Sequence, residues 1–505
     1  MRHLVVCCDG TWNTPDQEKQ GVPTPTNVVR LHHALDAGPD QLRYYHPGVG
    51  TEAGLINKMR GGALGEGLAD NIKSAYSWLA THYQDGDAIC MFGFSRGAYT
   101  VRSLAGMMAA CGLARIPADT RPEERWAEID RLYHEVYRPP DRDQPTPAAP
   151  HQQVPIRFLG VWDTVGALGI PDSFGVLNLF DAGDRHRFHD TKLNPFVAHA
   201  RHAVALDERR GPFTPTLWDE SGMPEPKVDR SVRQRWFSGD HSDVGGGHLQ
   251  TGLSDGALLW MIDEARACTG LSFRKEMLEQ VHPDPCDVLH DSCTGIYLRL
   301  SPTPRAIPLI DEQRSTDIVD GSVFIRQARP PIAAGAYRPS RVLAVGETVS
   351  CAVFANEPWN APGWYLEPGQ YAFEATGEWL DRGVPVGPRG TQDGHFYPTE
   401  LSQLIGSFAA WWQERFREWT GNTAATFFGT PRTADDPWTA LIGVVAAKEL
   451  DADGVQQKYQ SFMIGDGCEQ RVEQPGYFYA YANDAWGFYD NNKGSVTLTV
   501  TRLAP

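Results

Sequence analysis

No stretch of this 505-residue sequence approaches the ~20 consecutive apolar residues that a membrane-spanning helix requires. The first nine residues also lack the layout of a signal peptide, because their apolar run is short and leads directly into an expected core strand. We therefore expect a protein that is cytoplasmic as synthesised and that reaches any external target by a signal-independent route. Peripheral contact with a membrane remains open.

Basic residues are scarce relative to acidic ones. Lysine and arginine total 46 against 63 aspartate and glutamate residues, which gives a net charge of −17. Such a chain is a poor match for the phosphate backbone of nucleic acids and for simple electrostatic adhesion to anionic lipid. The composition argues against nucleic acid as the main partner.

Cysteine gives no sign of a disulfide framework or of a zinc site. The nine residues are an odd number, no two of them form a Cys-x-x-Cys pair, and Cys7 and Cys8 fall inside a predicted strand. Disulfide-stapled domains and structural zinc sites both need regular spacings. We interpret these cysteines as reduced thiols of a globular core.

The order of predicted elements divides the chain into two domains. Strands and helices alternate over the first hundred residues, which is typical of a doubly wound α/β domain with a mostly parallel sheet. From about residue 343, strands with period-two alternation predict an antiparallel β-sandwich. We predict one domain over 1–342 and a second over 345–505, with a helical insertion near 397–435 that holds an aromatic-rich helix at 399–420. The predicted strands of the first domain are 3–8, 42–46, 87–92, 154–162 and 232–237, with further short strands in 294–342, and its predicted helices are 27–35, 68–83, 98–107, 123–137 and 253–268.

The motif Gly-Phe-Ser-Arg-Gly at 93–97 stands between a predicted strand and a predicted helix. That context is the one a nucleophile elbow needs, with Ser95 on a turn so sharp that a Cβ atom at Gly93 or Gly97 would collide with neighbouring backbone. The backbone N–H of Arg96 would point to where an oxyanion forms. The alternative is a tight strand-to-helix turn in which Ser95 only caps the helix.

Two further groups follow the carboxyl ends of strands, where open α/β sheets bind their ligands. Asp163 comes after the strand 154–162 and is a candidate for the acid that orients a catalytic histidine, although a turn or helix-capping aspartate would look the same. Gly10 or Thr11, after the first strand, is a candidate for the second oxyanion N–H. An ordinary Asp-Gly turn is the alternative there.

The histidine of a hydrolytic site is expected after a strand that follows Asp163. His241 meets this condition, because it lies in a glycine-rich stretch after the strand 232–237, and His248 is the second candidate. By contrast, His186, His189 and His202 have no such context. A metal site made from Asp240, His241, Asp243 and His248 is a further alternative.

Five ordered motifs over about the first 340 residues resemble the DUF2235 family of α/β-hydrolases. They are Asp9-Gly10-Thr11, residues 45–51, residues 93–98, residues 161–165 and residues 241–247. The family includes phospholipase effectors that type VI secretion systems deliver. The resemblance implies an α/β-hydrolase fold and a serine esterase with the triad Ser95, Asp163 and His241, which works without a cofactor.

The resemblance favours a lipid or phospholipid ester as substrate and export by a type VI system or another signal-independent route. Two alternatives stay open. One is an esterase that removes O-acyl groups from polysaccharides or other glycans. The other is a degenerate hydrolase scaffold that has no catalytic activity and presents the second domain to glycans or other partners.

The C-terminal region resembles the calcium-dependent galactose-binding lectins of the PA-IL type. The likeness lies in residues 359–379, 385–390 and above all 483–495. The matched positions imply a Ca²⁺ ion held by Asp484, Asn491, Asn492 and the backbone carbonyl of Phe488, with Asp381 as a further ligand. Hard oxygen ligands of this kind suit Ca²⁺, and an asparagine-rich hairpin turn is the alternative.

Overall fold

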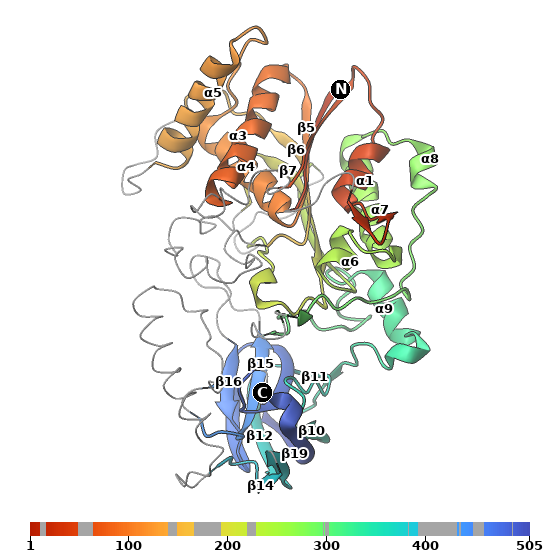
Figure 1. Ribbon diagram of the computed structural model, residues 1–505, viewed down its shortest axis with the longest axis vertical. Helices are drawn as coiled ribbons and strands as arrows, with labels where there is room; N and C mark the ends of the chain where they lie inside the picture. The colour runs from red at the N-terminus through yellow and green to blue at the C-terminus, as the bar shows by residue number, and fades with distance from the viewer. Residues whose placement is uncertain are drawn as a thin grey trace.

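The computed structural model places a helix-covered sheet above a β-sandwich (Figure 1). The residues that the structure describes are 1–10, 17–48, 64–139, 149–165, 193–219, 229–295, 297, 302–381, 383–391, 432–433, 436–447, 459–486 and 488–505. The predicted helix at 399–420 and nearly all of the predicted insertion lie outside them. Among the helices in these ranges, none combines the length and apolar character needed to cross a membrane.

Six parallel strands form the central sheet of the N-terminal domain. In spatial order they are β4 (Gln41–His46), β1 (His3–Cys8), β5 (Ala88–Phe94), β6 (Ile156–Trp162), β7 (Val197–Ala205) and β8 (Ser231–Phe237). The chain moves from β1 outward to β4 and then returns to β5 on the other side. This doubly wound order confirms the predicted α/β-hydrolase class, and the strand order reverses between β1 and β5, which is where sheets of this class bind their ligands.

Helices cover both faces of this sheet, as Figure 1 shows: α3 (Leu64–His82), α4 (Arg96–Cys111) and α5 (Pro122–Arg131) on one side, α1 (Asn27–Ala34) and α7 (Gly252–Thr269) on the other. Leu4 and Val6 of β1 pack toward α3 and α4, whereas Val5 and Cys7 pack toward α1 and α7. Both sets are buried, which explains why this strand is apolar at every position. The smaller elements of this domain are β2 (Glu18–Lys19), β3 (Val22–Pro23), a π-helical turn (Leu132–Tyr137), a 3₁₀ turn (Gly211–Phe213), α6 (His241–Gly245) and α8 (Lys275–Leu278).

The structure corrects two parts of the sequence-based prediction. Strand β7 was not predicted, because His199, Arg201 and His202 interrupt its apolar pattern. Arg201 is accommodated by an ion pair with Glu264 of α7 and by hydrogen bonds to Ser231. Within the described part of 294–342, the short strands expected there are reduced to β9 (Arg341–Val342). That region instead holds helix α9 (Gly321–Ala328) and a 3₁₀ turn (Ile332–Ala334).

The C-terminal domain is a β-sandwich with two antiparallel sheets, apart from a parallel pairing of β9 with β11. One sheet has the order β14-β13-β19-β12-β17, with β10 also paired to β19, and the other has the order β16-β15-β18-β11-β9. Burial alternates along β12, as period-two strands predict. The strands are β10 (Thr348–Phe354), β11 (Trp364–Leu366), β12 (Gly369–Thr376), β13 (Trp379–Asp381), β14 (Val384–Val386), β15 (Leu441–Ala447), β16 (Gln460–Met463), β17 (Gly467–Val472), β18 (Gly476–Ala482) and β19 (Asn492–Ala504), and a 3₁₀ turn (Tyr489–Asn491) precedes β19.

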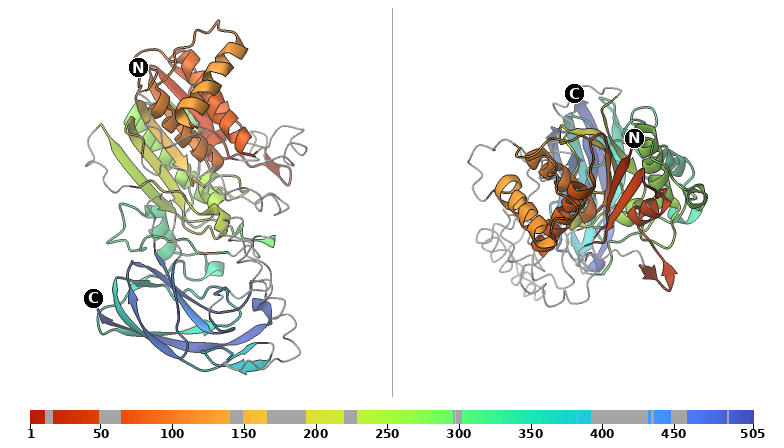
Figure 2. Two further views of the ribbon diagram at one scale, coloured as in Figure 1. Left: turned by 90° about the vertical axis from the view of Figure 1, so that its left-hand side faces the viewer. Right: turned by 90° about the horizontal axis from the view of Figure 1, so that it is seen from above.

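Strands β15 and β18 join the two domains, since they are buried on both faces. Phe478 belongs to the core of the sandwich, whereas its neighbour Tyr479 packs in an apolar cluster that includes Val204 and Trp236 of the central sheet. Figure 2 shows the sandwich next to one end of the helix-covered sheet of the N-terminal domain. The predicted boundary near 342–345 falls between β9 and β10, and its status as a domain boundary stays a prediction.

Candidate active site

The turn after β5 has the geometry of a strained elbow. Ser95 has a backbone φ of 57°, in the left-handed region that side chains rarely adopt, and α4 begins at the next residue. A Cβ atom at Gly93 would collide with the backbone of Gly97, and one at Gly97 would collide with the carbonyl groups of Cys8 and Asp9. The Ser95 side chain makes no capping hydrogen bond to α4, so the arrangement does not support the capping-serine alternative.

Asp163 directly follows β6 and is fully buried, also with a positive φ, of 36°. Its Oδ1 accepts a hydrogen bond from the Ala205 N–H at 2.9 Å, and its Oδ2 accepts one from Nδ1 of His241 at 2.6 Å. The Arg305 guanidinium binds both oxygens, at 2.7 and 2.9 Å. Burial raises the pKa of this carboxyl group, but the charge of Arg305 and the hydrogen bonds from His241 and Arg305 outweigh it and hold the pKa well below its usual range.

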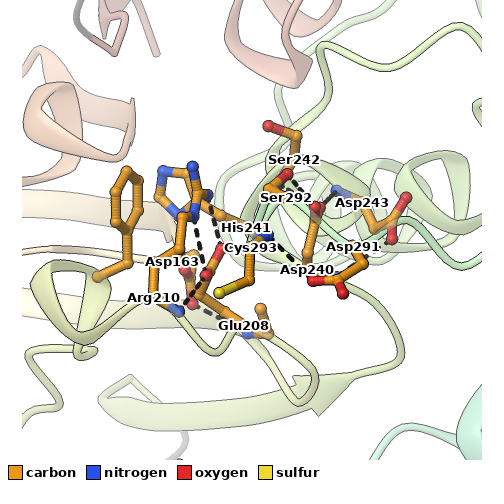
Figure 3. Close-up of polar contacts among 12 residues, drawn as sticks. Asp163, Glu208, Arg210, Asp240, His241, Ser242, Asp243, Asp291, Ser292 and Cys293 are labelled. Atoms are coloured by element: carbon orange, nitrogen blue, oxygen red, sulfur yellow. Dashed lines mark hydrogen bonds and ion pairs between the residues drawn. The ribbon is translucent and has the colours of Figure 1, made fainter. Parts of the chain in front are cut away.

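His241 is the first residue of helix α6 rather than part of an open loop, as its glycine-rich context had suggested. Its imidazole packs between two rings, Phe94 with centroids 4.5 Å apart and Phe213 with centroids 5.0 Å apart. Figure 3 shows the ring beside Asp163, with Glu208 and Arg210 close by. Because Phe94 immediately precedes Ser95, these contacts bring the serine, the histidine and the aspartate to one edge of the sheet.

The candidate oxyanion groups lie around the end of β1. The Gly10 N–H donates to Oδ1 of Asp9 at 2.7 Å, and the same carboxylate accepts hydrogen bonds from Thr26 at 2.7 Å and from Tyr45 at 2.9 Å. Gly10 therefore already uses its N–H in this structure. Thr11 lies outside the described residues, and Arg96 occupies the first position of α4, as the elbow requires.

His248, the second candidate base, is not bonded to Asp163. Its Nε2 donates to Asp240, the residue that caps α6, at 3.1 Å, and its ring stacks on that of His290 with centroids 3.8 Å apart. His290 in turn donates from Nδ1 to Asp243 at 2.6 Å. The buried carboxylates of Asp240 and Asp243, which flank His241 in the sequence, thus each form a hydrogen bond with an imidazole.

The same cluster bears on the metal alternative. Ligand atoms of Asp243, His248 and His290 lie within 4.8 Å of one another, so the group differs from the predicted set by excluding His241 and Asp240 and adding His290. The other two ring nitrogens are also engaged, His248 Nδ1 by Lys19 at 3.4 Å and His290 Nε2 by Gln250 at 3.2 Å. Hydrogen bonding alone therefore accounts for the cluster, which braces the helix that carries His241.

Sequence reasoning missed three residues of the site. Glu208 accepts a hydrogen bond from the His241 backbone N–H at 3.4 Å and pairs with Arg210, Arg305 binds Asp163, and His290 binds Asp243. None of them carries a local signal. Arg305 stands 142 positions from its partner, in the sequence Pro-Thr-Pro-Arg, which reads as a linker.

His202 supports the site from the neighbouring strand β7. Its Nε2 accepts a hydrogen bond from the Thr164 backbone N–H at 3.1 Å, beside the candidate acid. Burial, with the nearby charge of Arg102, lowers its pKa to about 3, so the imidazole is neutral at ordinary pH. A structural histidine of this kind fits the sequence-based choice of His241 over His202.

The predicted calcium ligands of the sandwich lie close together. Asp381 pairs with Asn492 across strands β13 and β19, and Nδ2 of Asn492 donates to Oδ2 of Asp484 at 2.8 Å. The side-chain oxygens of Asn491 and Asn492 are buried without a hydrogen-bond partner in the described chain. The Phe488 carbonyl accepts from the Asn491 N–H at 3.2 Å. Buried amide and carboxylate oxygens are ligands of the kind that Ca²⁺ takes, so the chemistry of this group fits the predicted ion.

Comparison with known proteins finds a family for the N-terminal domain. A family model described as "T6SS, Phospholipase effector Tle1-like, catalytic domain" matches residues 2–264. An uncharacterized protein of Saccharomyces cerevisiae, YEL023C, is 29% identical over an alignment of 236 residues, and the match covers 42% of this chain and 32% of the yeast protein.

Two solved structures are similar at lower identity. One is an uncharacterized protein from Pseudomonas aeruginosa, at 20% identity and a TM-score of 0.33, covering 56% of this chain and 49% of the other. The second is a Tle1 effector bound to the VgrG spike of the type 6 secretion system, at 19% identity and a TM-score of 0.27, covering 49% of this chain and 51% of the other. The chain thus spans about a third to a half of the length of these relatives. The C-terminal likeness to calcium-dependent lectins has no counterpart among these matches.

Proposed function

Because this chain belongs to the family of Tle1-like phospholipase effectors of type VI secretion, we propose that it hydrolyses carboxylic esters of lipids, with phospholipids as the favoured class. The matched region, 2–264, contains Ser95, Asp163 and His241. The observation that carries the proposal is the 2.6 Å hydrogen bond from His241 to the buried Asp163, on an imidazole that packs against the residue preceding Ser95. This is the arrangement that serine acyl transfer needs.

In the proposed reaction, Ser95 Oγ attacks the ester carbonyl carbon while Nε2 of His241 takes the hydroxyl proton. Asp163 accepts from Nδ1–H, which fixes the tautomer that leaves Nε2 as the base and stabilises the imidazolium that forms. The alcohol leaves with the proton from His241, and an acyl group remains on Ser95. Water, activated by the same imidazole, then releases the acid. The Arg96 N–H, with Thr11 or a rearranged Gly10, would stabilise the oxyanion.

Family membership also supports a proposal about where the protein acts. We propose export by a type VI system, with a lipid membrane of the target as the source of substrate.

The experiment that tests the function compares substrates. Purified protein is assayed against phospholipid vesicles, a short acyl ester and an acetylated polysaccharide, in parallel with Ser95→Ala. We expect Ser95-dependent release of fatty acid and little release of acetate. Ser95-dependent release of acetate alone would favour the glycan esterase, whereas full activity of Ser95→Ala on every substrate would exclude the serine mechanism.

A second function is proposed for the sandwich, namely binding of one Ca²⁺ ion and, through it, a glycan. The supporting observation is the pair of buried, unpartnered oxygens on Asn491 and Asn492 next to Asp484. Asp381 and the Phe488 carbonyl would complete the set. One or two carboxylates and two amides form a weakly charged site, for which affinity on the order of 10⁻⁴ M is typical of extracellular modules.

A further inference from the structure

Arg305 is bound to the candidate acid more completely than any other side chain. Its guanidinium contacts both oxygens of Asp163, at 2.7 and 2.9 Å, and also donates to the carbonyl groups of Ala205 and Phe213. The exposed fractions of the Arg305 and Asp163 side chains are 4% and 0%. A bidentate pair in this environment fixes the carboxylate in one plane, because rotation would leave a buried charge without its partner.

Arg305 comes from outside the region that matches the catalytic family, which ends at residue 264. It lies in the segment 302–306, where the two domains meet. The sandwich holds this segment at two positions just before Arg305: the indole N–H of Trp359 donates to the Pro302 carbonyl at 2.6 Å, and the Tyr459 hydroxyl donates to the Pro304 carbonyl at 2.7 Å. The Thr303 N–H donates to the Arg209 carbonyl of the catalytic domain at 2.7 Å.

We propose that the β-sandwich completes the hydrolytic site, by holding Arg305 as a positioning residue on the carboxylate of Asp163. The inference rests on the proposed function and deepens it, because it makes the second domain part of the catalytic apparatus in addition to any role in binding. Arg305 touches no reacting atom. It acts through Asp163, which in turn sets the orientation and tautomer of His241.

The positive charge of Arg305 lowers the pKa of Asp163, and an experiment can measure the effect of removing that charge. Burial alone would raise the pKa of Asp163, and Arg305 is the nearest cation that opposes it. The other titratable groups that interact with this carboxylate are His241 of α6 and His202 of β7. Around them, Arg102 of α4 acts on His202, and Glu208, paired with Arg210, accepts from the His241 backbone N–H. Without Arg305, Asp163 should take up a proton at a higher pH, and the protonated acid no longer stabilises an imidazolium.

The first test measures kcat/KM on a short acyl ester as a function of pH for the full chain, for Arg305→Met and for Arg305→Lys. We expect kcat/KM of Arg305→Met to be lower than that of the parent by at least about tenfold, the usual order for a buried charged hydrogen bond. On the acid side of the pH profile, activity of this variant should be lost at a higher pH than in the parent protein. Arg305→Lys should recover part of the lost kcat/KM and part of the shift of the acid limb. An unchanged pH profile and rate in a folded Arg305→Met protein would overturn the proposal.

The second test asks whether the sandwich acts through Arg305. Tyr459→Phe removes only the hydroxyl that holds Pro304, and Tyr371→Phe is its matched control, since it removes a hydroxyl bonded to the Glu367 carbonyl within the sandwich. We expect Tyr459→Phe to lower kcat about threefold with little change in KM, the order expected for one neutral hydrogen bond, while Tyr371→Phe leaves kcat unchanged. Melting curves verify that each variant is folded.

A double-mutant cycle completes the design, because coupled residues do not contribute additively. Tyr459→Phe should have no further effect in the Arg305→Met background. Equal effects in both backgrounds, or equal losses in Tyr459→Phe and Tyr371→Phe, would contradict the inference. The Ser95→Ala variant distinguishes failure of the proposed function from failure of this inference. Full activity of Ser95→Ala would contradict the proposed function itself. Activity that depends on Ser95 but is unchanged in Arg305→Met would contradict only the inference about Arg305.

Discussion

Phe94 packs on the imidazole of His241 with the ring centroids 4.5 Å apart, and this contact joins the serine elbow to the helix that carries the base. Gly245 of the same helix lies so close to the Phe94 ring that a Cβ atom there would overlap it. Phe94 is thus a packing residue of the core and also a spacer that sets where Ser95 and His241 stand relative to each other.

Replacing Phe94 by leucine tests this spacing. We expect kcat on a short ester to fall about tenfold, since small misplacements of catalytic groups are costly, with a smaller change in KM. Phe158→Leu is the matched control, because Phe158 is equally buried in the same apolar cluster and lies on the adjacent strand. Equal losses of kcat in the two variants would show that the effect is one of general packing.

The glycines of the elbow give a prediction about stability. Gly97→Ala places a Cβ atom against the carbonyl groups of Cys8 and Asp9, and we expect it to lower the free energy of unfolding by about 2 kcal/mol or more. Gly256→Ala is the control, because Gly256 lies in helix α7 with open space around its Cβ position. That variant should gain up to about 1 kcal/mol. Denaturant melts of both compare them directly, and a neutral Gly97→Ala would contradict the elbow geometry.

Local signals were sufficient for much of the fold and for part of the site. The apolar run of β1 and the Gly-x-Ser-x-Gly motif each carry their structural cause within a few residues. Strand β7 has no such signal, because the charge of Arg201 is matched by Glu264, 63 positions later. A pattern within one segment cannot report a partner that only the folded chain supplies.

The same limit divides the site residues. The positions of Asp163 and His241 after the ends of strands are enough to predict both residues. Arg305, Glu208 and His290 lie at places that look like linker or loop, and only the folded chain brings them to the site. Gly10 shows the reverse case, since its position suggested an oxyanion donor and its N–H is bonded to Asp9.

His202 predicts how stability depends on pH. Its pKa falls from 6.5 to about 3 on folding, because burial disfavours the charged ring. Between these values the unfolded chain binds a proton that the folded chain does not, so stability falls as the pH falls, by about 1.4 kcal/mol per pH unit. His202→Gln should remove that part of the slope between pH 6 and 4, whereas His134→Gln, at an exposed helical position, should leave it. Unfolding curves at several pH values measure both, and equal slopes in all three proteins would be inconsistent with a buried neutral His202.

The sandwich gives a prediction about calcium. Chelator-treated protein should gain melting temperature when millimolar Ca²⁺ is added, and Asp484→Ala should abolish the gain because it removes the central carboxylate. Asp490→Ala is the control, since Asp490 is an exposed acid of the same loop. Titration calorimetry gives an independent readout. If Ca²⁺ produces neither heat nor a shift in the parent protein, the loop is an asparagine-rich turn.

The central claim is that Ser95 forms an acyl-enzyme with His241 as its base. Labelling with an active-site fluorophosphonate, read by intact-protein and peptide mass spectrometry, tests it most directly. We predict one adduct per chain, on the peptide that contains Ser95, with no adduct in Ser95→Ala and labelling slowed about a thousandfold or more in His241→Ala, in line with the non-additive losses seen when a triad member is removed. An unlabelled parent protein that still releases fatty acid, or an adduct on another residue, would contradict the account.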